Sequence, residues 1–394
     1  MEFSRPGAAI LACLLLVTGC TTAGADEHAS SPPRTSTPPG ADPVVQVSAS
    51  HCGEGWTNPH AGRLTLMLSN TGDAPSGADL IEVPGGAVHA EVEGLGPGVT
   101  RPMSVSLAQG TYAIRCEIDE RDPIVGPSVT VTGTGTGGPA IIPVSYADLF
   151  APAKAYSAYV SSGLKTLLAR TRTLTRAVDR GDLAAARKAW LPAHLAYESL
   201  GSAYGTFGEF DGAINGHPAG LPGGVHDKDF TGLHRVEYGL WHGESAERLR
   251  PIADRLLKDV KALDDDFPDQ RLEPGDLPLR AHEILENTLR FELTGRSDQG
   301  SGTTLATAAA NVQGTRETLG VLRPLLEDRY PAMKQVDEHL DQVDALLAAQ
   351  HHGDTWTPVD RLAPRVRQPI NGAVGGLLEE LAPIAEILFP RRTK

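Results

Sequence analysis

Apolar residues recur at steps of three and four through the second half of the chain, the spacing that predicts amphipathic helices. The first two such runs cover 156–178 and 183–204, and Gly181-Asp182 between them supplies a helix stop followed by an N-cap. Two amphipathic helices joined by so short a turn predict an antiparallel hairpin. Further runs predict helices at 245–263, 279–294, 304–328, 330–349 and 359–388.

The region ahead of these helices has a different period. Short runs of alternating apolar and polar residues, separated by Gly and Pro, predict a small β-sandwich. These runs lie at 45–47, 64–68, 90–93, 104–107, 112–118 and 129–131. Closely spaced glycines from 133 to 138 then indicate a linker. We therefore expect a multidomain protein, with a β-sandwich over 44–134, a linker over 135–144 and an all-α domain over 145–390.

The N-terminus has the pattern of an exported protein. Residues 1–19 contain an apolar run over 8–17 that is too short to span a bilayer, as in a secretory signal peptide. Val17-Thr18-Gly19-Cys20 resembles the lipobox of bacterial lipoproteins, in which the cysteine is lipidated, with palmitate for example, and becomes the first residue. Segment 20–43 is rich in Ser, Thr, Pro, Gly and Ala, which is typical of a disordered tether. We expect lipid anchoring to the extracytoplasmic face of the cell membrane; the alternative is a plain cleaved signal.

Cysteine usage and charge narrow the function classes. With Cys13 in the signal and Cys20 lipidated, only Cys52 and Cys116 remain, and two cysteines left in an exported chain most often form a disulfide. A blue-copper site would need His and Met near the second cysteine, where this chain has acidic residues instead. The net charge of -14 disfavours nucleic-acid binding. It is compatible with a protein that concentrates cations and equally with one that is merely soluble.

One sequence motif carries metal chemistry. His234 and Glu237 stand at i and i+3 in the opening turns of an expected helix, so the imidazole and the carboxylate lie on one face. A zinc-protease helix needs His-Glu-x-x-His, and Tyr238 occupies the position of its second imidazole. His-x-x-Glu is common by chance, so the surrounding residues must support the assignment. Upstream, Glu198 follows His194 by one helical turn, and 205–229 is expected to be a long functional loop.

The motif and its surroundings resemble a known family. Gly232-Leu233-His234-Arg235-Val236-Glu237 matches the Gly-x-His-x-x-Glu signature of imelysin-like domains. Tyr197-Glu198 and Phe207-Gly208-Glu209-Phe210-Asp211 resemble the segments that precede it in the exported component of Efe-type iron-uptake systems. The resemblance covers about 145–388 and implies a double helical bundle. The preceding sandwich resembles the cupredoxin-like domain of the longer family members.

The resemblance implies a metal site made of Glu198, Asp211, His234 and Glu237, suited to ferrous or ferric iron, with zinc as an alternative. His194 and Glu209 are expected as outer-shell groups. The family usually has a second aspartate where this chain has Asn215, so His217 or His226 is a further candidate ligand.

Three hypotheses follow for function. The first is an extracytoplasmic lipoprotein that captures iron and delivers it to an Efe-type system, whose membrane permease and haem peroxidase are its implied partners. The alternative is a metallopeptidase of the imelysin type, which would need a general base beside the metal, and Glu209 is the one candidate nearby. In the third, the helical bundle is only a docking surface for a permease.

Overall fold

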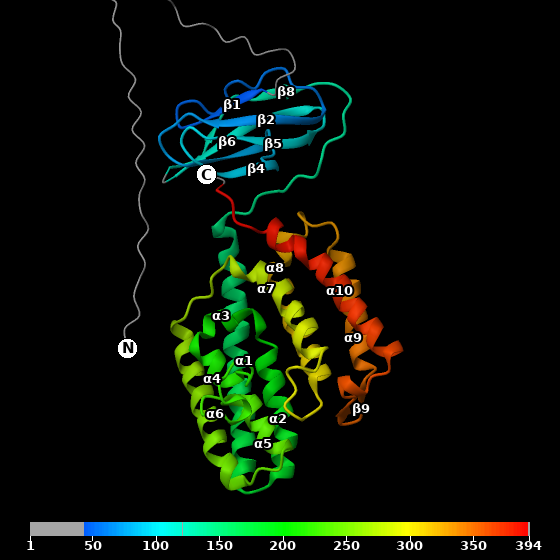
Figure 1. Cartoon of the computed structure of the whole chain (residues 1–394). Coiled ribbons are helices and arrows are strands. Elements are labelled where there is room, and N and C mark those ends of the chain that lie inside the picture. The colour runs from blue at the N-terminus through cyan, green and yellow to red at the C-terminus, as the bar shows by residue number, and fades with distance from the viewer. Residues whose placement is uncertain (1–42, 120, 393–394) are drawn as a thin grey trace, which may run out of the picture. The chain divides into compact units, whose positions relative to one another are not determined.

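The computed structural model describes residues 43–119 and 121–392, in which a β-rich region is followed by a helical one (Figure 1). The expected signal peptide, Cys20 and nearly all of the expected tether lie outside the described residues. Within the described part, none of the helices combines the length and the apolar character needed to cross a bilayer.

Two sheets form the β-rich region. In the first, β1 (Val44–Val47) pairs parallel with β2 (Gly62–Asn70), and β2 pairs antiparallel with β5 (Thr100–Leu107). The second sheet has the order β4-β3-β6-β7, with β8 also paired to β6. Its strands are β3 (Ser76–Glu82), β4 (Val88–Leu95), β6 (Gly110–Ile118), β7 (Ile124–Val125) and β8 (Val129–Val131). Apolar side chains from both sheets share one core, so this region is a β-sandwich as the alternation predicts.

Strand β3 is the long strand that the alternating pattern does not reveal. It lies between β4 and β6, and all but its last residue is buried or half-buried. Ala78 and Leu80 face the main core, whereas Ile81 packs in a second small cluster with Val88 and Ala113. A strand covered on both faces loses its period-two pattern. The buried Asp79 is paired with Arg115 of β6.

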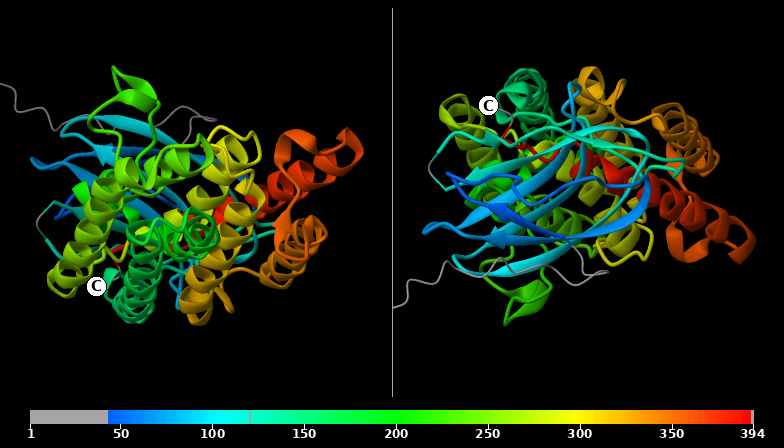
Figure 2. Two further views of the ribbon diagram at one scale, coloured as in Figure 1. Left: turned by 90° about the horizontal axis from the view of Figure 1, so that it is seen from below. Right: turned by 90° about the horizontal axis from the view of Figure 1, so that it is seen from above.

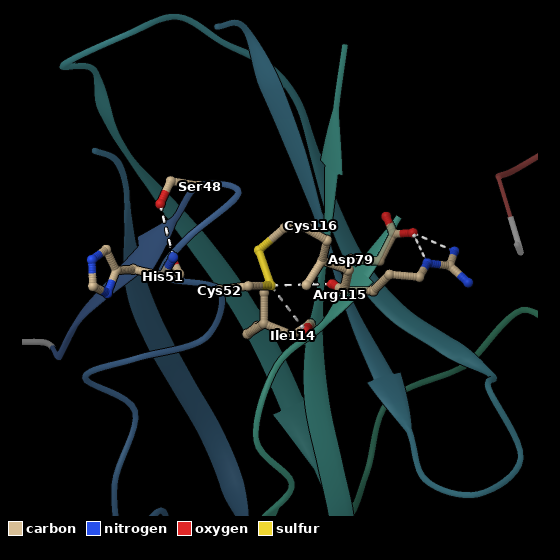
Figure 3. Close-up of a disulfide and its surroundings, with 8 residues drawn as sticks. Ser48, His51, Cys52, Asp79, Ile114, Arg115 and Cys116 are labelled. Atoms are coloured by element: carbon tan, nitrogen blue, oxygen red, sulfur yellow. Dashed lines mark hydrogen bonds and ion pairs between the residues drawn. A yellow bond between two sulfur atoms is a disulfide. The ribbon is translucent and has the colours of Figure 1, made fainter. Parts of the chain in front are cut away.

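Cys52 and Cys116 form a disulfide, with Cα atoms 5.9 Å apart (Figure 3). Cys116 is fully buried two residues before the end of β6, and Cys52 lies in the segment between β1 and β2. The bond therefore joins that segment to the second sheet across the sandwich core.

The helical region begins with a hairpin of α1 (Phe150–Asp179) and α2 (Leu183–Glu198). Gly181 takes a positive φ of 73° and the Asp182 carboxylate accepts a hydrogen bond from the Ala185 amide, so the predicted stop and cap are present. Helix α1 packs on α2 and α6, and α2 also packs on α5 and α8. Figure 2 shows the helices in two views related to Figure 1 by quarter turns. The remaining long helices are α5 (Gly232–Trp241), α6 (Ala246–Asp266), α7 (Asp276–Asn287), α8 (Thr304–Leu326), α9 (Met333–Ala348) and α10 (Pro364–Ile387).

The expectation of an uninterrupted loop over 205–229 is wrong in its first part. Two short helices, α3 (Tyr204–Phe207) and α4 (Glu209–Asn215), occupy that part. Gly208 between them has a φ of 57°, and Phe207 is buried in the helical core. Helices this short do not complete enough turns to show a 3.6-residue period, so the apolar pattern did not reveal them.

Candidate metal centre

The last turns of α2 present His194 and Glu198 on one face of the helix. The two residues are four apart, and Nε2 of His194 lies 3.0 Å from Oε1 of Glu198. Both side chains are buried. Trp190, one turn earlier, stacks its ring on His194 at 4.8 Å between ring centroids and donates a hydrogen bond to the Leu233 carbonyl at 2.8 Å. The indole therefore both packs against the imidazole and ties α2 to the start of α5.

The first turns of α5 present the second pair, His234 and Glu237. Nδ1 of His234 lies 3.1 Å from Oε2 of Glu237, and both residues are buried. The glycine of the sequence motif has a steric reason: Gly232 has a φ of 83°, and a Cβ there would lie 2.3 Å from the carbonyl oxygen of Ile214. Only glycine lets α5 begin this close to the end of α4.

Glu237 also makes contacts that no local pattern indicates. Its Oε1 accepts hydrogen bonds from the backbone amides of Gln299 and Ser301, both at 3.1 Å. The amides of Gly300, between those two residues, and of Gly302, after them, donate instead to Asp298. A single turn of π-helix, η5 (Thr288–Glu292), which we call the π-turn, follows α7, and the loop after it is thus folded around two carboxylates. Both oxygens of Glu237 therefore have partners, and one of them contacts Nδ1 of His234. This contact orients the His234 ring and leaves its Nε2 available for another interaction.

Three side chains from the two helices converge. His194, Glu198 and His234 each offer a ligand atom, and these atoms all lie within 4.8 Å of one another. The buried polar atoms around His194 are only partly satisfied. Its Nε2 faces Oε1 of Glu198 at 3.0 Å, whereas its Nδ1 has no hydrogen-bond partner within the described part of the chain. Buried polar atoms are ordinarily satisfied, so an imidazole with a bare Nδ1 and with Nε2 against a carboxylate suits a shared cation.

Glu198 is held in place by neutral donors. Asn215, at the end of α4, donates from Nδ2 to Oε1 at 2.7 Å. The side-chain amide of Asn311 in α8 makes hydrogen bonds to both neighbours in one orientation. Its nitrogen then donates to Oε2 of Glu198 at 3.2 Å, and its oxygen accepts from the Thr288 hydroxyl at 3.0 Å. Amide donors leave the negative charge of Glu198 available to a cation, whereas a lysine or arginine would cancel it.

Burial sets the protonation of the cluster. It lowers the pKa of His234 to about 3, with repulsion from His194 acting in the same direction. It raises the pKa of Glu237 to about 8, opposed by a hydrogen bond from Ser301. Burial also works against ionisation of Glu198, but hydrogen bonding and attraction to His194, together with Asn215, hold its pKa below the usual range. His234 is therefore neutral and Glu198 charged at neutral pH, which are the forms that bind a metal.

The other residues expected at the site lie at different positions. Asp211 accepts a hydrogen bond from Tyr197 at 2.5 Å and lines the cavity beside the cluster. His217 reaches the cluster, with its ring centroid 4.0 Å from that of His234 and its outer side exposed. His226 faces Tyr238 instead, at 6.4 Å between ring centroids. Glu209 is exposed at the start of α4 and does not line the cavity.

The role expected for His194 was that of an outer-shell group, whereas the structure places one of its ring nitrogens among the converging ligand atoms. Its spacing of four residues from Glu198 is the signal in the sequence that points there. The sequence did not indicate Glu292 as a site residue, because no spacing relates it to the other residues of the cluster. It is buried beside the cluster, accepts a hydrogen bond from Ser297, and has its pKa raised to about 8, first by burial and then by the charge of Glu198.

A cavity of about 620 Å³ opens beside the cluster. Glu198, Asp211, Asn215 and His217 line one part of it. The rest is lined from α7, the π-turn and the loop that follows, by Arg280, Glu283, Asn287, Phe291, Glu292, Arg296, Ser297 and Gln299 among others.

The helical domain holds a buried cluster of imidazoles and a carboxylate beside an open cavity. These features define a candidate metal-binding helical protein. The family model described as Imelysin (Peptidase_M75) matches residues 152–384. The chain belongs to the imelysin family, and the matched residues include α2 and α5 with the whole cluster.

Curated relatives extend the similarity into the β-sandwich. The chain is 27% identical over 330 residues to the iron uptake system component EfeO of Yersinia pestis, covering 83% of this chain and 86% of the relative. It is 26% identical over 347 residues to EfeO of Escherichia coli O157:H7, covering 87% and 90%. It is 31% identical over 237 residues to the iron uptake system component EfeM of Pseudomonas syringae pv. syringae, covering 60% of this chain and 83% of that one.

Among solved structures, the chain is similar to a putative iron-regulated protein A precursor from Parabacteroides distasonis. The TM-score is 0.48 at 12% identity, with 62% of this chain and 96% of that one covered.

Proposed function

We propose that this protein binds iron outside the cytoplasm and passes it to the membrane components of an iron-uptake system. The observation that carries the proposal is the convergence of His194, Glu198 and His234, with Nδ1 of His194 left without a partner among the described residues. Two imidazoles and one carboxylate with open positions are a ligand set typical of ferrous iron. The relatives named as iron uptake components support iron over other divalent ions.

Each residue of the cluster has a role in this proposal. His194, Glu198 and His234 ligate the ion, and Glu237 orients His234 through Nδ1, so its role differs from the ligand role that the family resemblance implies. Asn215 and Asn311 hold Glu198. Asp211 stands at the cavity, where its carboxylate attracts a cation on the way to the cluster. His217 lies against His234 and is placed to shield the bound ion from solvent.

The wider setting of the site is part of the proposal. A lipid anchor at Cys20, followed by the tether, keeps the protein at the extracytoplasmic face of the membrane. There it meets a permease and a haem peroxidase of an Efe-type system. The two-sheet arrangement of the N-terminal region supports its kinship with cupredoxin-like domains. Both cysteines of that region are bonded to each other, so neither offers the thiolate that a blue-copper site requires.

The test is an anaerobic calorimetric titration of the wild-type protein and of His234→Ala with ferrous ion. We expect one ion per chain for the wild type and no binding for the variant. His226→Ala is the matched control, because it removes an imidazole from the neighbouring loop and leaves the cluster intact. Equal binding by wild type and His234→Ala refutes the site.

Two further measurements separate this function from the other hypotheses. Chelator-sensitive cleavage of an unfolded protein, lost in His234→Ala, would support a metallopeptidase. The exposed position of Glu209 gives that hypothesis no general base at the cluster. Normal iron uptake by cells that carry His234→Ala would support a docking role alone.

A further inference from the structure

The cavity beside the cluster is much larger than an ion requires. A water molecule takes up about 30 Å³ in the liquid, and ligand pockets for small molecules run from about 300 to 1,000 Å³. At about 620 Å³ the cavity falls in the second range. Of the three metal donors, Glu198 lines this cavity, while His194 and His234 line a separate pocket of about 10 Å³. The cavity therefore reaches the metal centre at Glu198. There is room here for a small molecule in contact with the bound ion.

The ligand count also leaves space for such a molecule. His194, Glu198 and His234 offer one ligand atom each, while iron held by two imidazoles and a carboxylate keeps open positions. Glu237 does not fill them, because both of its oxygens have partners. Hard oxygen donors from a chelator would suit these positions.

The charge and hydrogen-bonding groups in the wall indicate the chemistry of the molecule. Two arginines and four acidic residues line the cavity. Arg280 is bonded to Glu283, Asp211 accepts from Tyr197 and Glu292 from Ser297, and Glu198 is the metal donor. The exposed side chain of Arg296 makes no ion pair or hydrogen bond to any described residue, and its planar guanidinium matches a carboxylate. Asn215 lines the same cavity, and its buried Oδ1 has no hydrogen-bond donor in the described part of the chain. An unpaired cation and an unpaired acceptor together favour a molecule that carries both carboxylate and hydroxyl groups.

We propose that this cavity binds a small hydroxycarboxylate chelator together with the metal, so that iron is taken up as a chelate. Arg296 binds a free carboxylate of the chelator, Asn215 accepts from its hydroxyl group, and its remaining oxygens complete the coordination of the ion. The inference rests on the proposed function for the identity of the ion and extends it to the form in which the ion arrives.

The experiment uses citrate as the probe. Wild-type protein, Arg296→Gln and Arg290→Gln are dialysed against ferric citrate made with labelled citrate, and retained iron and citrate are both counted. Arg290 is the matched control because it lies on the π-turn nearby and does not line the cavity. Each substitution removes one positive charge from an exposed side chain, so neither threatens the fold.

We expect the wild type and Arg290→Gln to retain citrate and iron in equal amounts. Arg296→Gln should bind the chelate about tenfold more weakly, the effect of losing a charge-assisted contact at an exposed site. Its anaerobic titration with ferrous ion alone should match that of the wild type. Iron retained without citrate, or the same loss in both arginine variants, overturns the inference.

The two proposals fail in different ways. If His234→Ala abolishes ferrous binding while Arg296→Gln leaves ferric citrate binding unchanged, the metal centre stands and the chelate inference falls. If the wild type binds neither ferrous ion nor ferric citrate, the proposed function falls and the inference with it.

Discussion

The β-sandwich and the helical domain both bury charged groups, but these groups are fully paired in the sandwich and only partly paired in the helical domain. In the sandwich, Arg115 donates two hydrogen bonds to one oxygen of Asp79, so each charge has its partner (Figure 3). In the helical domain, Nε2 of His194 faces a carboxylate that is otherwise held by neutral donors, and Nδ1 of the same ring has no hydrogen-bond partner among the described residues. A buried pair that is complete needs nothing more from outside. A buried cluster that is incomplete indicates a ligand.

The largest expected effect is on iron binding. His194→Ala should lower ferrous affinity by more than about 100-fold, because loss of a direct ligand costs more than the 10–100-fold typical of outer-shell residues. Asp211→Asn serves as the comparison and should retain binding, since its carboxylate is engaged by Tyr197. Anaerobic calorimetry measures both. If Asp211→Asn lowers ferrous affinity more than His194→Ala does, Asp211 is a ligand of the ion.

Breaking the complete pair should damage the sandwich instead. Arg115→Met leaves Asp79 buried without its counter-charge, and such a loss costs about 3–5 kcal/mol in the free energy of unfolding. Hydrogen exchange read on peptides of β3 and β6 should show the loss, with ferrous binding unchanged. If exchange in these peptides stays at the wild-type level, the pair does not stabilise the sandwich.

Removal of the disulfide tests whether the two regions fold independently. With Cys52→Ser and Cys116→Ser combined, the sandwich should lose about 2–5 kcal/mol of stability. The helical domain has no cysteine and should keep its fold and its iron site. Thermal melts with and without iron measure this. A single shared transition that moves as a whole would show that the two regions unfold together.

A smaller effect on iron binding is expected for Glu237, which contacts the ligand His234. Glu237→Gln should weaken iron binding by about 10–100-fold without abolishing it, because it disturbs the orientation of His234 and leaves the three ligands in place. Complete loss, equal to that of His194→Ala, would mean that Glu237 ligates the ion directly.

The smallest effect is on the stability of the metal-free protein. His194→Leu should lower the free energy of unfolding by only about 1 kcal/mol, since it removes the contact of Nε2 with Glu198 while Asn215 still donates to that carboxylate. The same variant binds no iron. A large destabilisation would mean that the cluster is structural, like the pair in the sandwich.

Local spacing made several features of this protein predictable. The 3.6-residue period located the long helices, and the Gly181-Asp182 stop and cap follow from two residues alone. The pairing of His234 with Glu237 is local as well, because residues three apart on a helix are neighbours wherever the helix lies. Cys52 and Cys116 could be paired by elimination.

The tertiary structure decided which of these residues form the metal centre. Strand β3, buried on both faces, and the short helices α3 and α4 carry no readable period. Whether a carboxylate faces the ion depends on distant contacts: the amides that engage Glu237 lie 62 and 64 residues further along the chain. Sequence by itself supplied the donors on each helix, and only the packing of α2 against α5 and of the 298–302 loop against Glu237 set which donors converge. The reason is that helical periodicity determines neighbours within a helix, whereas the partners of a buried atom depend on every element packed around it.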